Sequence, residues 1–203
     1  MDKTLKLIII GLLLGDANIQ TFQKTQPITT ARLRILHSTK QIQYLKHKYH
    51  LLNPYVRQKN ILFLKQKKEN KIYHKCYFNT QTLKQFAFFY HMFYKKDLHT
   101  KRVIKVLPAL IHRYLEPITL AYWYMDDGSL KWKNHSKAVR LCTDSFSKQE
   151  TEHLVCLLNQ KYNLKARTFR TRSRLRIYIP NRNKEFSQLI SDYIHPSMKY
   201  KIP

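Results

Sequence analysis

The chain has 203 residues, of which 43% are hydrophobic, and this content supports a folded core and excludes disorder over most of its length. Lys and Arg total 38 against 12 Asp and Glu, which gives a formal net charge of +26. Such an excess implies a polyanionic partner, and nucleic acid fits better than a membrane surface because the basic residues are spread along the chain. The three cysteines are far apart and form no C-x-x-C pair, so a zinc ribbon or a disulfide framework is unsupported.

The first predicted element is a helix that contains the apolar run at residues 7–14 and ends just before Asp16. The run is too short to cross a membrane as a helix. A signal peptide is the other interpretation of such a start. It is disfavoured because a closely similar segment recurs at residues 120–128, where it ends in Asp127 and Gly128. The recurrence indicates an internal duplication.

The segment that follows Asp16 has a regular order of patterns. Residues 31–37 predict a strand, and Ser38 to Gln41 form a capping-box pattern that opens a helix. Two further strands are predicted at residues 61–67 and 72–78, and a helix at residues 82–94.

The same order of patterns repeats after Asp127. The predicted elements are a strand at residues 137–143, a helix opened by the capping-box pattern of Ser147 to Glu150, strands at 166–171 and 174–179, and a helix at 184–193. We therefore predict an α+β fold in which the order αββαββα occurs twice about a pseudo-twofold axis. The two predicted halves span residues 1–112 and 113–203.

A helix that is apolar on every side is buried on every side. Gly11 and Gly15 lie four residues apart and so share one face, where a second helix can approach closely. The natural partner is the equivalent helix near residues 118–126, with Ala121 as its small residue. Packing of these two helices would join the halves at the centre of the molecule.

This packing would bring Asp16 and Asp127 together, because each lies at the C-terminal end of its helix. Two carboxylates beside the negative ends of two helix dipoles need positive charge to offset them, and a divalent metal is the simplest source. Carboxylate oxygens suit Mg²⁺, which can promote phosphodiester hydrolysis. The alternative is a pair of core helices with polar caps, which the repetition of the aspartate disfavours.

The two segments resemble the paired motifs of the LAGLIDADG homing endonucleases, in the branch that carries both motifs in one chain. The resemblance implies that Asp16 and Asp127 are catalytic and bind Mg²⁺, with Mn²⁺ as a substitute, and that Lys105 and Lys201 assist catalysis. It also implies two antiparallel saddle-shaped sheets over a long double-stranded DNA target, with the motif helices packed at the centre. Cleavage of both strands would leave short 3′ overhangs. The likeness is strongest at residues 9–19, 104–108, 117–130 and 198–203.

Several positions depart from the family pattern. Ala17 and Tyr122 stand where the motifs usually have glycine, which leaves open how tightly the helices pack. Asp126 precedes Asp127, so either carboxylate is a candidate to face the site. Lys199 is likewise an alternative to Lys201.

Side-chain alternation in the predicted strands creates basic faces opposite apolar ones. Arg32 and Arg34 share one face, and Arg174 and Arg176 share another. Strands of this kind fit the major groove of DNA, where Arg reads guanine edges, whereas the alternative is ordinary solvated charge. The residues expected to bind DNA are Arg32, Arg34, Lys65, Lys67, Lys131, Lys133, Arg140, Arg172, Arg174 and Arg176.

Together with these patterns, the resemblance implies a site-specific, intron-encoded DNA endonuclease that acts as a monomer, without a membrane or an obligate protein partner. The alternative is a maturase that binds its own intron RNA and assists splicing, alone or as a second role. A non-catalytic DNA-binding regulator would have lost one or both aspartates. Scarce Gly with abundant Lys, Ile, Tyr and Phe is typical of an AT-rich genome, and so an organelle is the expected location.

Overall fold

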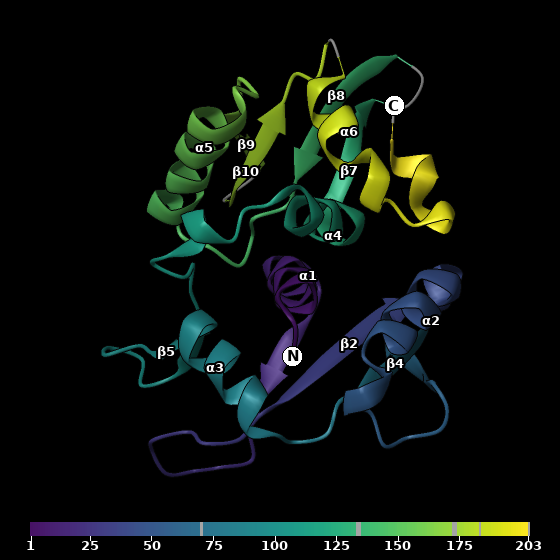
Figure 1. The fold of residues 1–203 in the computed structure, drawn as a ribbon, viewed down its shortest axis with the longest axis vertical. Coiled ribbons are helices and arrows are strands. Elements are labelled where there is room, and N and C mark those ends of the chain that lie inside the picture. The colour runs from purple at the N-terminus through teal and green to yellow at the C-terminus, as the bar shows by residue number, and fades with distance from the viewer. Residues whose placement is uncertain (70, 133–134, 172–173, 183, 203) are drawn as a thin grey trace.

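The computed structural model describes residues 1–69, 71–132, 135–171, 174–182 and 184–202. Lys133 and Arg172, both expected to bind DNA, lie outside the described residues. Two four-stranded antiparallel sheets, one from each part of the chain, lie on either side of a central pair of helices (Figure 1). Within the described residues, no helix is long and apolar enough to cross a membrane.

The first part of the chain forms one sheet with the strand order β1-β2-β4-β3. Its helices and strands follow the predicted order, with boundaries within a few residues of the predicted ones. They are α1 (Lys3–Leu14), β1 (Asn18–Gln20), β2 (Arg32–Ser38), α2 (Ile42–Leu51), β3 (Leu62–Lys68), β4 (Lys71–Asn79) and α3 (Lys84–Phe93).

The second part repeats this arrangement with the strand order β7-β8-β10-β9. The prediction of a duplicated αββαββα order in an α+β fold is confirmed. The elements are α4 (Pro117–Asp127), β7 (Gly128–Trp132), β8 (Ser136–Leu141), α5 (Lys148–Tyr162), β9 (Arg167–Thr171), β10 (Arg174–Ile179) and α6 (Glu185–Ile190).

A short hairpin between the two parts was not predicted. It pairs β5 (Tyr94–Lys96) with β6 (Val103–Lys105), and Val106 N–H then donates to the Phe93 carbonyl at 2.7 Å. Its strands are only three residues long and rich in Lys, so they carry no clear alternation. The hairpin matters because its last residue, Lys105, is one of the expected site residues.

The two capping-box patterns have different outcomes. Ser147 and Glu150 form the complete reciprocal box at the start of α5. Ser38 instead opens a 3₁₀ turn at Thr39–Gln41, and α2 begins only at Ile42. The Gln41 side chain is turned toward His37, with Oε1 3.1 Å from Nδ1, and so does not close the box.

Helices α1 and α4 pack side by side at the centre, as predicted, and are seen end-on in Figure 1. A Cβ added at Gly11 would lie 2.5 Å from the Thr119 carbonyl oxygen and 3.0 Å from the Tyr122 Cβ. A Cβ at Gly15 would lie 2.6 Å from the Asp126 Cβ. The glycines of α1 therefore give the close approach by themselves, so Tyr122 in place of a motif glycine does not separate the helices.

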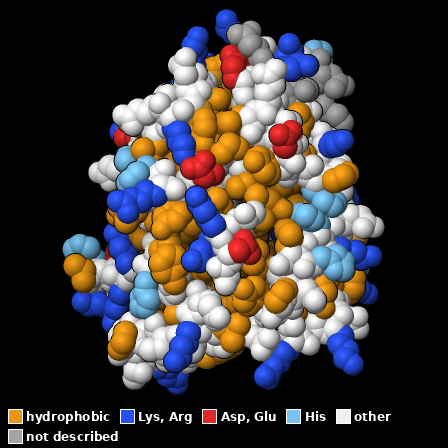
Figure 2. All heavy atoms as spheres, viewed as in Figure 1, with side chains coloured by type: hydrophobic (Ala, Val, Ile, Leu, Met, Phe, Trp, Pro, Cys, Tyr) orange, Lys and Arg blue, Asp and Glu red, His pale blue; other side chains and the backbone are white. Residues whose placement is uncertain are grey.

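Figure 2 shows one face of the molecule, in the orientation of Figure 1. Hydrophobic side chains gather across its middle, and many Lys and Arg side chains lie toward its edge. This face carries no continuous basic surface, although the chain has 38 Lys and Arg residues.

Candidate active site at the ends of the two motif helices

The predicted catalytic aspartates lie at matching ends of the packed helices. Asp16 follows the C-cap residue Gly15 of α1, and Asp127 is the last residue of α4. Burial and the nearby Asp126 raise the pKa of Asp16, although its side chain remains 42% exposed. Burial, followed by the negative charges of Asp16 and Asp126, raises the pKa of Asp127 to about 7. The negative charge of Asp16 thus reaches Asp127 and disfavours the ionised form of its carboxyl group.

The predicted lysines reach the same place, each from the end of its own half. Lys105 Nζ donates to the Gly15 carbonyl at 3.3 Å. Lys201 Nζ donates to the Met125 carbonyl at 2.6 Å and to the Asp126 carbonyl at 3.0 Å. Burial lowers the pKa of Lys105 to about 8, against the opposing effect of Asp127 and the other site carboxylates.

These contacts add a second source of positive charge to the divalent metal expected at the helix ends. Each lysine places an ammonium on the unsatisfied carbonyls at the negative end of a helix dipole. Lys199, the alternative to Lys201, is exposed on the surface instead. The lysines therefore provide part of the positive charge, and the carboxylates remain available for a cation.

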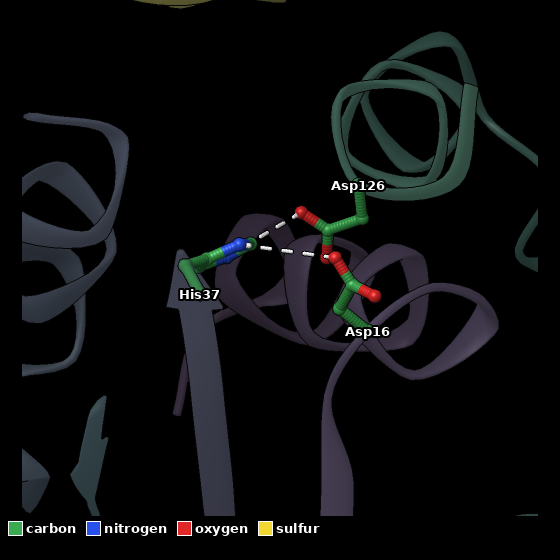
Figure 3. A group of neighbouring side chains, drawn as sticks. All are labelled: Asp16, His37 and Asp126. Atoms are coloured by element: carbon green, nitrogen blue, oxygen red, sulfur yellow. Dashed lines mark ion pairs between the residues drawn. The ribbon is translucent and has the colours of Figure 1, made fainter. Parts of the chain in front are cut away.

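A buried network that the sequence did not indicate adjoins the aspartates. Lys48 of α2 is fully enclosed; its ammonium binds Asp126 Oδ1 and donates to His37 Nε2 at 2.8 Å. His37 lies 3.8 Å from Asp16 and 3.8 Å from Asp126, and Figure 3 shows the three side chains pointing toward one another. A lysine in a largely polar helix normally faces solvent, so no sequence pattern marks Lys48 as buried.

His37 suits a hydrogen-bonding role better than metal ligation. One oxygen or nitrogen atom from each of Asp16, His37 and Asp126 lies within 4.8 Å of the others. The Lys48 ammonium donates to His37 Nε2, so the proton of the neutral ring is on Nδ1. Nδ1–H then donates to Gln41 Oε1 at 3.1 Å. Burial and Lys48 lower the pKa of His37 to about 3, so the ring is neutral. Both nitrogens are engaged, and the oxygens remain as ligands.

The available oxygens fit a hard divalent cation. Asp16 follows α1 and Asp127 ends α4, and the charge of Asp16 reaches Asp127. Asp126 Oδ2 is buried and accepts no hydrogen bond from the described residues. Carboxylate oxygens with room for water and phosphate are the ligand set that Mg²⁺ prefers. The site can therefore hold a divalent cation against a phosphodiester.

The exposed face of the second sheet combines basic and aromatic side chains. Strand register places Tyr178 opposite Arg140 on one side and Arg167 on the other. Lys131 and Arg167 lie over the Tyr178 ring, at 5.3 and 4.6 Å from its centroid. Arg140 lies 4.9 Å from the ring centroid of Phe169. Arg167 was not predicted, although its place in the alternation with Phe169 could have indicated it.

The two arginines of β10 that were predicted to bind DNA, Arg174 and Arg176, differ in their surroundings. Arg174 is exposed at the start of the strand. Arg176 forms a bidentate pair with Asp144, with nitrogen–oxygen distances of 2.9 and 2.6 Å. The guanidinium of Arg176 is thus held in place by a carboxylate, and it can bind DNA only with its remaining donors.

In the first sheet, Arg32 and Arg34 occupy the face opposite the buried Leu33 and Ile35, as predicted. Arg32 donates to Gln20 Oε1 and lies 4.6 Å from the ring centroid of Phe22. Arg34 lies 4.6 Å from the ring centroid of Tyr77. Each guanidinium is therefore held against an aromatic ring.

The lysines expected in β3 are placed differently. Lys65 pairs with His74 and Lys67 with Ile72, so both share the sheet face of Cys76, opposite that of Arg34. The basic residues of this hairpin that share the face of Arg34 are Lys68, Lys71 and Lys75. Alternation within β3 alone cannot identify the face that a strand presents, because that depends on its pairing with β4.

Comparison with known proteins agrees with this geometry. A model of the LAGLIDADG DNA endonuclease family matches residues 6–186. The chain is 36% identical to the DNA endonuclease I-ChuI of Chlamydomonas applanata, over 97% of this chain and 93% of that protein. It is 32% identical to the cytochrome b mRNA maturase bI2 of Saccharomyces cerevisiae, over 96% of this chain but only 46% of the maturase.

A solved structure supports the same conclusion. The homing endonuclease I-WcaI bound to its DNA recognition sequence superposes with a TM-score of 0.86 and 27% sequence identity. The match covers 100% of this chain and 87% of that protein. Family model, sequence and fold agree over nearly the whole length, and the resemblance seen in the two motifs is confirmed. The chain belongs to the LAGLIDADG DNA endonuclease family.

Proposed function

We propose that this protein is a site-specific homing endonuclease that hydrolyses both strands of a long DNA target in a divalent-metal-dependent reaction. The observation that carries the proposal is the placement of Asp16 and Asp127 at the C-terminal ends of two packed helices, with a lysine bound at each end. Basic strand faces on both sheets supply the binding surface for the DNA backbone.

In this mechanism Asp16 and Asp127 would hold Mg²⁺, with Mn²⁺ as a substitute. When bound, the metal would supply Lewis acidity for phosphodiester hydrolysis. Lys105 and Lys201 already lie at the helix ends, where an ammonium group can orient the nucleophile or offset charge developing on the phosphate. The arginines held against aromatic rings bind the DNA with little loss of side-chain freedom.

The target and the reaction are tested together by incubating the protein with a random library of double-stranded DNA and Mg²⁺. Sequencing of the cut ends would give both the site and the overhang. We expect one long non-palindromic site, because the two halves of the chain differ in sequence. Cleavage without a preferred site, or no cleavage in Mg²⁺ or Mn²⁺, would contradict the proposal.

A second candidate function is maturase activity on the intron RNA that encodes the protein. It is favoured by the 32% identity to the cytochrome b mRNA maturase bI2 of Saccharomyces cerevisiae. The basic surface can bind either polymer, but splicing assistance does not need the aspartates. Splicing of the cognate intron by an Asp16→Asn/Asp127→Asn variant would separate the two roles. An intron-encoded origin in an organelle genome remains our proposal for its location.

A further inference from the structure

Lys48 links the two halves of the molecule beside the active site. It lies in α2 of the first half, and its ammonium binds the Asp126 carboxylate of α4 in the second half. Both side chains have 0% exposed surface. The same ammonium donates to His37 Nε2 at 2.8 Å and lies 4.1 Å from the ring centroid of Tyr44. Lys48 therefore holds groups from three elements, β2, α2 and α4, in one arrangement.

Stability alone does not account for this pair. Removing two charges from water costs free energy that their attraction only partly offsets, and apolar replacements of such pairs are often neutral or stabilising. Gly15 is the residue of the first motif that corresponds to Asp126 of the second. The two residues pack directly against each other, because a Cβ added at Gly15 would lie only 2.6 Å from the Asp126 Cβ. The charged Asp126 of α4 therefore lies at the helix crossing, directly against a glycine next to the end of α1.

The place of the pair suggests what it does. Asp126 directly precedes Asp127, and its partner His37 lies 3.8 Å from Asp16. A bond between Lys48 and Asp126 therefore fixes the last turn of α4 against the first half of the molecule. Lys201, the other cation on that turn, belongs to the second half and cannot fix it relative to Asp16.

We propose that Lys48 is a positioning residue, which sets the separation of Asp16 and Asp127 by binding Asp126 and His37 across the boundary between the halves. The proposal rests on the nuclease function proposed above. Hydrolysis requires a narrow geometry, and misplacement by about 1 Å can cost about a hundredfold in rate. Hydrogen-bonded ion pairs are directional whereas the hydrophobic effect is not, so this pair constrains the geometry in a way that apolar packing does not.

The competing explanation is that the pair only stabilises the fold, and a set of three variants separates the two. Lys48→Met and Asp126→Asn each leave one buried charge unpaired, so both should lower the melting temperature. The double variant Lys48→Met/Asp126→Asn removes both charges while nearly keeping the volume, and should recover most of the melting temperature. We expect it to remain about tenfold to a hundredfold slower in single-turnover cleavage at saturating protein.

A second readout depends on the site rather than on folding. If the carboxylates are misplaced, the Mg²⁺ concentration for half-maximal rate should rise in the double variant, while the affinity for DNA in Ca²⁺ stays within about threefold of native. Lys48→Arg keeps a cation beside Asp126 and should retain more of the rate than Lys48→Met. If the double variant does not fold, the comparison of Lys48→Arg with Lys48→Met still tests the positioning role. The matched control is the exposed pair of Lys161 and Glu116, at 2.8 Å, where Lys161→Met should change neither readout.

The outcomes are distinct. A double variant that recovers both the melting temperature and the native rate and Mg²⁺ dependence would overturn the positioning role while leaving the nuclease intact. A Lys48→Met variant that cleaves at the native rate would do the same. If the native protein itself fails to cleave the library in Mg²⁺ or Mn²⁺, the proposed function fails, and the positioning role fails with it.

Discussion

Asp16 and Asp127 lie at the ends of α1 and α4, and the negative charge of Asp16 adds to the burial that raises the pKa of Asp127. The nearby ammonium groups of Lys105 and Lys201 are bound to helix-end carbonyls and reduce this rise in pKa without removing it. At the scale of the residue, the site therefore combines close carboxylates with lysines that do not occupy their oxygens. The separate roles of these two residue types lead to different predictions.

Asp16→Asn and Asp127→Asn should each abolish cleavage, because an amide cannot supply the anionic oxygen that a hard cation prefers. Binding to the target should survive, and should even strengthen slightly, since each substitution removes one negative charge facing the DNA. Gel-shift titration in Ca²⁺ and cleavage in Mg²⁺ would measure the two properties. Native cleavage by either variant, or full native activity in EDTA, would exclude that aspartate or the metal from the mechanism.

Lys105→Met and Lys201→Met should each lower the single-turnover rate by about tenfold or more, as is usual for a positioned acid–base or charge-stabilising group. Because the lysines come from different halves, each variant should nick one strand faster than the other. Strand-specific labels on the target would measure both rates. Lys199→Met is the matched control, because Lys199 is exposed and should affect neither strand. Equal native rates at saturation would assign the lysines to phosphate binding only.

At the scale of the element, the crossing of α1 and α4 determines how close the two halves come. Gly11 and Gly15 lie on the same face of α1, where added Cβ atoms would meet α4 at 2.5 and 2.6 Å. These distances are far below van der Waals contact, and the Gly11 neighbour is backbone that cannot turn away. The helices can therefore cross at this distance only if both residues lack a side chain.

Gly11→Ala should destabilise the protein by about 1–3 kcal/mol, the usual cost of overpacking a core. The sign is informative, because the same change would stabilise a free helix by about 1 kcal/mol. Denaturant unfolding would measure the change. Gln160→Ala, on the exposed face of α5, controls for helix propensity and should be near neutral. If Gly11→Ala raises the free energy of unfolding, α1 and α4 are not in close contact at Gly11.

At the scale of the whole molecule, the net charge of +26 is distributed unevenly. One face carries mixed apolar and basic side chains (Figure 2), whereas the exposed faces of both sheets place Arg and Lys beside aromatic rings. Two sheets related by duplication present these faces from one chain. A single chain can therefore contact both halves of an asymmetric DNA site.

Binding to DNA should depend strongly on salt. Each neutralised phosphate contributes about −0.9 to the slope of log K against log salt concentration, so we expect a slope steeper than about −5. Fluorescence anisotropy across a salt series would measure it. Arg34→Gln should reduce the slope by about 1 if this residue contacts a phosphate. A nearly flat dependence would argue against any nucleic-acid partner.

The active species should be a monomer, because Asp16 and Asp127 from one chain complete the site. Light scattering of the protein bound to its target should give the mass of one chain per DNA. With target DNA in excess over total protein, mixing native protein with an Asp16→Asn/Asp127→Asn variant provides the control, since a monomer then retains native activity in proportion to its share. A dimer on one site, or dominant inhibition by the variant under excess DNA, would contradict this stoichiometry.

The sequence by itself determined the duplicated order of elements, the central helix pair and the four expected site residues. Apolar runs with period 3.6 and alternating strands are local patterns, and the repeated aspartate and lysine positions made the duplication visible. Asp16 and Asp127 could be named because an aspartate ends both repeated segments. Lys105 and Lys201 were named from the resemblance to the LAGLIDADG family, by their positions before prolines. The domain boundary near residue 112 and the roles of these residues remain predictions.

The tertiary structure alone decided which side chains meet across the halves. Asp126 lies 78 residues from Lys48 in the sequence, and Lys48 sits in a helix whose polar residues suggest exposure. The burial of this pair therefore depends on packing that no local pattern encodes. The face of Lys65 and Lys67 likewise depends on the register of β3 against β4. Burial and strand pairing are properties of the assembled fold, because they depend on elements distant in sequence. Local composition can therefore name the catalytic chemistry, but not the buried contacts that hold it in place.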